Sequence, residues 1–208
     1  MSVINKSNYL FSIKLGGKRF AVVDILETER LLLVPYQLSF IEATLIGDNK
    51  LSEVSGYSVA KEWPGVEFFF YLPYVLEAVK ENENKEKWTH LVILKSENKI
   101  IGEVSAQGSP EITGEAELGY GIVDAYAGNG YATEGASAFL NWLVSEEIKI
   151  IKAKTYLYHK KSQHILTKLG FIKKGEGFFA GDERVAYFEW KPEQKASNEI
   201  NLLKKEAK

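Results

Sequence analysis

The stretch from Glu117 to Leu143, ELGYGIVDAYAGNGYATEGASAFLNWL, most constrains what this chain can fold into. It reads as an alternating strand, a turn containing Gly128 and Gly130, and an amphipathic helix. Glycines permit positive φ angles and let the N–H groups of a turn approach a ligand closely. The first turn of the helix adds unpaired N–H groups and a partial positive charge. This order therefore predicts a phosphate or pyrophosphate site made from backbone.

The helix after the turn is supported by its own pattern. Thr133 and Glu134 stand where a helix begins, and apolar residues then recur at helical spacing. The side chains expected on its buried face are Ala136, Phe139, Leu140, Leu143 and Val144.

Two common phosphate loops are excluded by the residues around the turn. A P-loop needs Gly-Lys-Ser/Thr, but Gly130 is followed by Tyr131 and Ala132. The Rossmann fingerprint fails because Thr133 stands where its third glycine would fall, and residues 150–154 offer no carboxylate for a ribose. A third type of pyrophosphate loop remains.

Segment 125–135 resembles the acetyl-CoA loop of the GNAT superfamily of N-acetyltransferases, whose pattern is Gln/Arg-x-x-Gly-x-Gly/Ala. Gly130 and Ala132 match its last two positions, whereas Ala127 departs from its first. Further segments resemble superfamily motifs in the same order: Thr28–Leu33 its first strand, Ile100–Glu103 its third, His159–Ser162 its Asn-x-x-Ser, and Leu169–Phe171 the end of its Lys-Leu-Gly-Phe. Leu166, where many members carry tyrosine, makes the ribosomal-protein N-terminal acetyltransferases the most similar subgroup.

The resemblance covers residues 26–191 and implies a GNAT domain of α/β (α+β) class. Its central mixed, mostly antiparallel sheet would be flanked by helices and splayed between the fourth and fifth strands, here 115–123 and 152–158. Residues 1–25 lie outside the resemblance and alternate around Gly16-Gly17, which predicts an added N-terminal β-hairpin. Residues 192–208 are expected to form a charged tail.

Acetyl-CoA is the cosubstrate that the resemblance implies. Its pantetheine arm would run beside the strand near Ile122 and Val123, with His159 standing where asparagine is usual. Gly119 and Gly121 share one face of this strand with Glu117, so the face is cleared either for pantetheine or to relieve packing against an aromatic ring. The pyrophosphate would lie on the loop residues Ala127, Gly128, Asn129, Gly130, Tyr131, Ala132 and Thr133.

The implied reaction is direct acetyl transfer to a primary amine, without a covalent enzyme intermediate. Glu117 is the candidate base because it lies on the glycine face; its alternative role is a solvated strand carboxylate. Ser162 is the candidate proton donor to the leaving thiolate, or else the N-cap of a helix at 163–169. A catalytically silent acyl-CoA-binding or regulatory module on the same fold is the alternative to an enzyme.

The acceptor is expected to be a protein N-terminus or a small amine. At pH 7 roughly one α-amino group in ten is neutral, against about one lysine in 2,500, so an N-terminal acceptor needs less catalytic help. An aromatic-rich segment, which contains Trp63, Phe68 and Tyr74, would help wall the acceptor site. A homodimer is also compatible with the sequence.

Composition excludes several other classes of function. The formal net charge of -2 over 208 residues argues against a nucleic-acid surface. The chain has no cysteine, and its 3 histidines lack metal-ligand spacing, so no metal site is expected. The sequence shows neither an 18-residue apolar run nor a signal peptide, which predicts a cytoplasmic protein without a membrane partner.

Overall fold

The computed structural model describes residues 25–179 and 181–192. These residues form two compact units. The described residues up to Ser105 join Tyr120–Phe139 in the first unit, and Ala106–Gly119 joins the chain from Leu140 onward in the second. The predicted N-terminal hairpin (1–25) and charged tail (192–208) lie almost entirely outside the described residues.

The helices and strands follow one another along the chain as follows. Those that begin in the first unit are β1 (Leu26–Glu27), β2 (Leu31–Pro35), α1 (Leu38–Ile46), α2 (Asp48–Ser55), β3 (Ser58–Val59), α3 (Val66–Glu81), the 3-10 helix η1 (Glu83–Trp88), β4 (Thr89–Leu94), β5 (Lys99–Gln107), the 3-10 helix η2 (Asp124–Tyr126) and α5 (Tyr131–Ser145). Those that begin in the second are α4 (Pro110–Thr113), β6 (Glu115–Ile122), β7 (Ile150–Tyr156), α6 (Lys160–Lys168), β8 (Ile172–Phe179) and β9 (Glu183–Trp190).

In the first unit, antiparallel pairing gives the strand order β1-β2-β4-β5. The short β3 adds to β5 in parallel, with Ser58 opposite Lys99. Strands β4 and β5 pair from Thr89 opposite Ser105 to Leu94 opposite Lys99, which places a tight connection at residues 95–98. β1 pairs with β2 and β4 pairs with β5 across short connections, whereas the chain between the paired β2 and β4 contains α1, α2, β3, α3 and η1.

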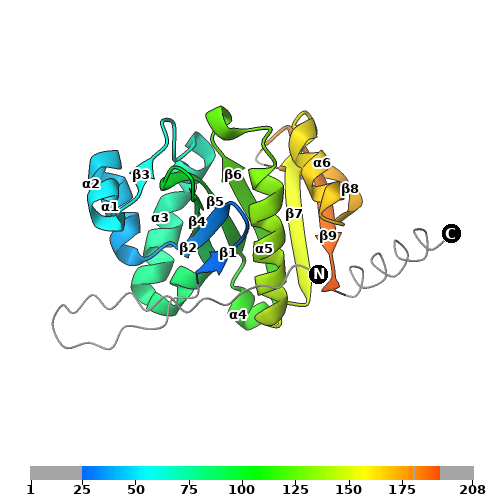
Figure 1. The fold of residues 1–208 in the computed structure, drawn as a ribbon. Helices are drawn as coiled ribbons and strands as arrows, with labels where there is room; N and C mark the ends of the chain where they lie inside the picture. The colour runs from blue at the N-terminus through cyan, green and yellow to red at the C-terminus, as the bar shows by residue number, and fades with distance from the viewer. Residues whose placement is uncertain (1–24, 180, 193–208) are drawn as a thin grey trace, which may run out of the picture. The chain divides into compact units, whose positions relative to one another are not determined.

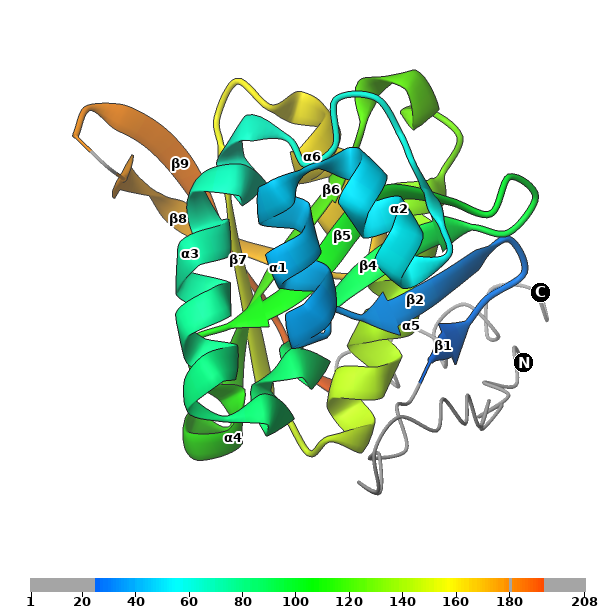
Figure 2. The ribbon, with the colours of Figure 1, turned by 90° about the vertical axis from the view of Figure 1, so that its left-hand side faces the viewer.

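Alternate residues of β4 point to opposite faces of the sheet, and the two faces contact different helices. Leu91 and Ile93 belong to a core cluster with residues of α1 and α3, such as Ile41 and Leu72. Figure 2 shows α1 and α3 lying across one side of β4 and β5. His90 takes the alternate register position and contacts Phe139 of α5, with ring centroids 5.2 Å apart. The helix that follows the glycine turn is therefore packed against the sheet.

The predicted buried face of α5 is correct except at its end. Ala136, Phe139, Leu140 and Leu143 are buried, at 3% exposure or less. The prediction was wrong for Val144, which is 38% exposed. Trp142 was not predicted to be buried but is only 5% exposed.

In the second unit, β7 lies between β6 and β9. It pairs with β9 in antiparallel fashion from Ile151 to Tyr156, and β9 pairs with β8 in the same sense. The parallel pairing of β6 with β7 covers only Glu115 opposite Ile150 through Glu117 opposite Lys152. This early end of the ladder confirms the predicted splay between these two strands. Figure 1 shows α6 beside the strands of this unit, and Gln163 Nε2 of α6 donates to Leu157 O at 2.9 Å.

Gly102 of β5 generates the first prediction. A Cβ at this position would overlap the carbonyl oxygen of Gly121 in β6. Gly102→Ala should therefore force the two strands apart and lower the free energy of unfolding by about 2 kcal/mol, the scale typical of overpacking. Thermal or denaturant unfolding measures the change. The matched control is Gly175→Ala in β8, where nothing lies within 4 Å of the added methyl group; equal stability of the two variants would contradict the prediction.

Candidate functional site

The glycine turn before α5 has the predicted backbone geometry. Gly128 and Gly130 adopt φ angles of 81° and 82°. Glu134 N–H donates to Gly130 O at 3.0 Å. The N–H groups of residues 131–133 precede this first helical bond, so they belong to the set that a helix leaves for caps or ligands. Such a terminus suits an anion, and the residues present fit the pyrophosphate of CoA.

Two predicted loop residues shape the turn from within. Ala127 N–H donates to Asp124 O at 3.0 Å. The side-chain amide of Asn129 donates to Tyr126 O at 3.1 Å and to Ala127 O at 3.3 Å. The amide of Ala127 and the side chain of Asn129 therefore stabilise the turn, and the N–H groups of residues 128–133 are the ones left to face an anion.

Tyr126 anchors the start of the turn to the β4–β5 connection. Its hydroxyl donates to Glu97 Oε2 at 2.6 Å and accepts from Lys99 Nζ at 3.0 Å. Lys99 also forms an ion pair with Glu97 at 2.5 Å. Hydrogen bonds from Lys99 and Tyr126 lower the pKa of Glu97, so the carboxylate remains charged and keeps both donors.

Arg30 anchors the other side of the turn. Its Nε and Nη2 atoms lie 2.7 and 2.6 Å from Glu134 Oε2, and its Nη1 donates to Asn129 O at 3.0 Å. The guanidinium carbon also lies 4.5 Å from the centre of the Tyr131 ring. In the sequence, Arg30 is visible only as part of a strand motif. Its partners Asn129 and Glu134 lie 99 and 104 positions away, so no local pattern connects them.

Glu134 also receives two donors besides the Arg30 guanidinium. Its Oε1 accepts from the Thr28 hydroxyl at 2.6 Å and from Arg30 N–H at 2.9 Å. Burial alone would raise the pKa of Glu134, but the hydrogen bonds from Thr28 and Arg30 outweigh it and hold the pKa below its ordinary value. The carboxylate is therefore ionised near neutral pH.

Of the two predicted strand contacts, Ile122 and Val123, only one has main-chain groups that face away from β5. Val123 N–H donates to Ile101 O at 3.0 Å, and Val123 O accepts from Tyr126 N–H at 2.9 Å. Successive peptide groups of a strand point to opposite sides, so the N–H and C=O of Ile122 point away from β5. A pantetheine arm running beside β6 would meet Ile122 there.

The sequence suggested that the face of Gly121 is free of side chains either for pantetheine or for an aromatic ring. The structure supports neither interpretation at Gly121. A Cβ on Gly121 would overlap Oε1 of Glu103. A side chain at this position would displace the Glu103 carboxylate, which comes from the neighbouring strand and occupies that space. This corrects the interpretation and brings Glu103 to the strand that should run along the cofactor.

Glu103 is a candidate functional residue that no sequence motif marked. Its half-buried carboxylate accepts a hydrogen bond from Trp63 Nε1 at 2.7 Å. Burial raises its pKa to about 7; the Trp63 bond opposes this rise, and the charge of Glu67 adds to it. A carboxylate in the otherwise uncharged run 100–106 was the available signal, since acids are seldom placed on buried strands without a role.

The remaining predicted catalytic residues lie in the second unit. Glu117 forms an ion pair with Lys154 at 2.5 Å, and Lys154 Nζ lies 4.5 Å from the centre of the Phe179 ring. His159 is the N-cap residue of α6 and makes no side-chain capping bond. The predicted capping role of Ser162 was wrong, because α6 begins at Lys160 and places Ser162 inside the helix.

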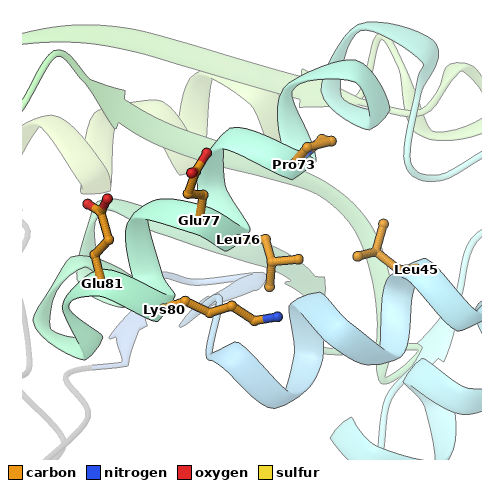
Figure 3. A pocket seen from close by; sticks show the side chains of 6 residues that line it. All are labelled: Leu45, Pro73, Leu76, Glu77, Lys80 and Glu81. Atoms are coloured by element: carbon orange, nitrogen blue, oxygen red, sulfur yellow. The ribbon is translucent and has the colours of Figure 1, made fainter.

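Other features of the described residues are separate from this site. Within the described ranges, no group of three or more potential ligands could hold a metal ion, and no helix is long and apolar enough to cross a membrane. A surface groove of about 380 Å³ lies between α1 and α3 (Figure 3), lined by Leu45, Pro73, Leu76, Glu77, Lys80 and Glu81. It contains none of the predicted site residues.

Comparisons with known proteins agree with this geometry. The family model "Acetyltransferase (GNAT) domain" matches residues 30–172. The uncharacterized N-acetyltransferase YjdG of Bacillus subtilis (strain 168) is 31% identical over 150 residues, which cover 71% of this chain and 89% of that protein. The chain therefore belongs to the GNAT family of acetyltransferases, and it is an acyltransferase.

Solved structures share the fold at low sequence identity. A ribosomal-protein-alanine acetyltransferase from Vibrio fischeri matches with a TM-score of 0.57 and 18% identity, covering 80% of this chain and 96% of that one. The microcin self-immunity acetyltransferase MccE, solved in complex with acetyl-CoA and AMP, matches with a TM-score of 0.55 and 14% identity, covering 79% and 93%. These likenesses confirm the predicted fold class, and acetyl-CoA is the cosubstrate of the family.

Gly130 allows a direct test of the loop. In Gly130→Val, a β-branched side chain would be forced into a φ of 82°, and the loop would have to move from its ligand. We expect acetyl-CoA affinity to fall roughly tenfold or more, since such strain costs 1–3 kcal/mol. Calorimetric titration measures the affinity. Gly56→Val, at a φ of 75° in another turn, is the control for backbone strain; a Gly130→Val protein that binds acetyl-CoA as tightly as the parent would refute the assignment.

The raised pKa of Glu103 predicts a pH-dependent cost to stability. Its pKa rises from 4.5 in the unfolded chain to about 7 in the folded protein, so the folded state binds more protons in this window. Stability from this group is thus full below pH 4.5 and falls as the pH rises to 7. Glu103→Gln should be more stable than the parent at pH 8, by up to about 3 kcal/mol, and lose this advantage at pH 4. Urea unfolding at both pH values measures the difference, and a pH-independent difference would contradict it.

Proposed function

We propose that this protein transfers the acetyl group of acetyl-CoA directly to a primary amine, with Glu103 as the general base. The observation that carries the proposal is the Glu103 carboxylate, held by Trp63 over Gly121 of β6 with a pKa of about 7. A base is most useful when its pKa lies near the working pH, because it is then both ionised and able to accept a proton.

The reaction needs no covalent enzyme intermediate. Glu103 accepts a proton from the ammonium form of the acceptor, directly or through water. The neutral nitrogen then attacks the thioester carbonyl carbon, the C–S bond breaks, and the second amine proton is lost while the thiolate gains one. In this proposal the amides of residues 128–133 hold the pyrophosphate, and main-chain groups of Ile122 hold the pantetheine arm.

Residues of the second unit enter the proposal in supporting roles. Ser162 supplies the proton to the leaving thiolate, and His159 contacts the pantetheine arm as the family pattern implies. Glu117 is the second candidate for the base. Its carboxylate is ion-paired with the Lys154 ammonium, whereas that of Glu103 accepts from a neutral indole, which is why we favour Glu103.

The acceptor that suits this base best is an amine of low pKa. A proton moving from an α-ammonium group of pKa about 8 to a carboxylate of pKa about 7 climbs roughly one pKa unit, whereas a lysine proton climbs more than three. We therefore propose an α-amino group, in a polypeptide or a small molecule, as the acceptor. The Vibrio fischeri protein of similar fold is described as a ribosomal-protein-alanine acetyltransferase. An alanine acceptor fits this class of α-amines.

Aromatic residues form the wall beside the proposed base. Ring contacts run from Trp63 to Phe68 at 6.1 Å, from Phe68 to Tyr71 at 6.4 Å, and from Tyr71 to Tyr74 at 6.4 Å. Trp63 and Phe68 are buried, but Tyr74 is 70% exposed. The line of rings therefore leads from the base to the surface, along the side by which an acceptor would enter.

The pH profile of turnover tests the base. For the parent, kcat/KM should rise with pH and level off above about 7, where Glu103 is ionised. Glu103→Gln should lose this limb and roughly a hundredfold of activity at pH 7, and the loss should shrink at high pH as the acceptor deprotonates itself. Thiol release from acetyl-CoA, with peptides of free and blocked N-termini as acceptors, measures the rate.

Two further variants make the result specific. Glu117→Gln should keep the profile of the parent, and Glu53→Gln, at an exposed ion pair of α2, controls for the loss of one negative charge. A full loss in Glu117→Gln with normal turnover in Glu103→Gln would transfer the role to Glu117.

A further inference from the structure

The first turn of α5 contains a carboxylate at a place where a bound pyrophosphate would be repelled. Glu134 follows Gly130 by one helical turn and is 18% exposed. The helix terminus attracts anions through its N–H groups, but an ionised side chain there brings a full negative charge. The loop can bind a multiply charged anion well only if this charge is cancelled.

Arg30 is the cation that lies against this carboxylate. It donates to Glu134 through Nε and through its backbone N–H, and its Nη2 lies 2.6 Å from the carboxylate. The pair is partly buried, so solvent screens it less than an exposed pair. The remaining arm of the guanidinium, Nη1, holds the carbonyl oxygen of Asn129. That carbonyl lies within the turn, so Arg30 also satisfies a second negative dipole there.

We propose that Arg30 is a positioning residue for the acetyl-CoA pyrophosphate, acting by cancelling the Glu134 charge and by fixing the Asn129 carbonyl. The inference rests on the proposed binding of acetyl-CoA at residues 128–133. It assigns Arg30 no contact with the ligand. Its consequence is that the two members of the ion pair have opposite effects on affinity, which a simple structural clamp would not produce.

The test is a double-mutant cycle on acetyl-CoA affinity. Arg30→Gln leaves Glu134 charged and uncompensated, so affinity should fall roughly tenfold, and more at low ionic strength. Glu134→Gln removes the repelling charge while leaving Arg30 charged, so affinity should equal or exceed that of the parent. The double variant should bind within about threefold of the parent, because the charge is absent in both partners.

Inorganic pyrophosphate, used as a competitor of acetyl-CoA, probes the anion site alone and should show the same order of affinities. Arg184→Gln is the matched control, since Arg184 forms an ion pair of the same kind with Glu176 in the β8–β9 hairpin. Its affinity for acetyl-CoA should be that of the parent. Thermal unfolding of each variant confirms that folded proteins are compared.

The outcomes separate this inference from the proposed function. Weaker binding in Glu134→Gln, or no recovery in the double variant, would show that the pair is only a structural clamp and would overturn the inference. If Arg30→Gln does not fold, the sign of the Glu134→Gln effect still decides. A parent protein that does not bind acetyl-CoA would instead overturn the proposed function, before any variant is compared.

Discussion

The close approach of β5 to β6 at Gly102 and Gly121 is the constraint on which the site depends. Each glycine gives space to an atom of the other strand: Gly102 to the carbonyl oxygen of Gly121, and Gly121 to the carboxylate of Glu103. A larger side chain at Gly102 would have to move the backbone of β6, and one at Gly121 would have to displace the Glu103 carboxylate. The Glu103 carboxylate therefore lies against Gly121 of β6, the strand that leads into the glycine turn. The proposed base and the proposed cofactor loop are thus connected through the end of one strand.

This arrangement has an energetic cost that the rest of the first unit must offset. A half-buried carboxylate with a pKa near 7 is less stable in the folded protein than in water. The single hydrogen bond from Trp63 compensates only part of that loss. Trp63 is itself fixed by packing against Tyr36 and Phe68 in the core shared by α1, α3 and the sheet. The hydrophobic core therefore maintains an acid in a state that solvent would not favour, as is common at catalytic sites.

Much of the fold could be predicted because its signals are local. Gly128 and Gly130 marked a turn with positive φ, the alternation at 115–122 marked a strand, and helical spacing marked α5. The proposed role of Glu103 could not be predicted in this way, since its pKa depends on burial in the assembled fold and on an indole 40 positions earlier. Likewise, the start of α6 at Lys160 is not marked by any capping side chain, so Ser162 was mistaken for the cap. Local chemistry predicts elements, whereas the environment of one carboxylate is a property of the assembled structure.

The line of aromatic rings from Trp63 to Tyr74 leads outward along α3, and this has a consequence for how such an enzyme changes over evolutionary time. The inner rings of this line, Trp63 and Phe68, belong to the core cluster, but its outer end at Tyr74 is 70% exposed. Substitutions at this outer end leave the glycine pair and the acid untouched. Under the proposed function, acceptor preference can therefore diverge by drift on one helix surface while the machinery of transfer is inherited intact.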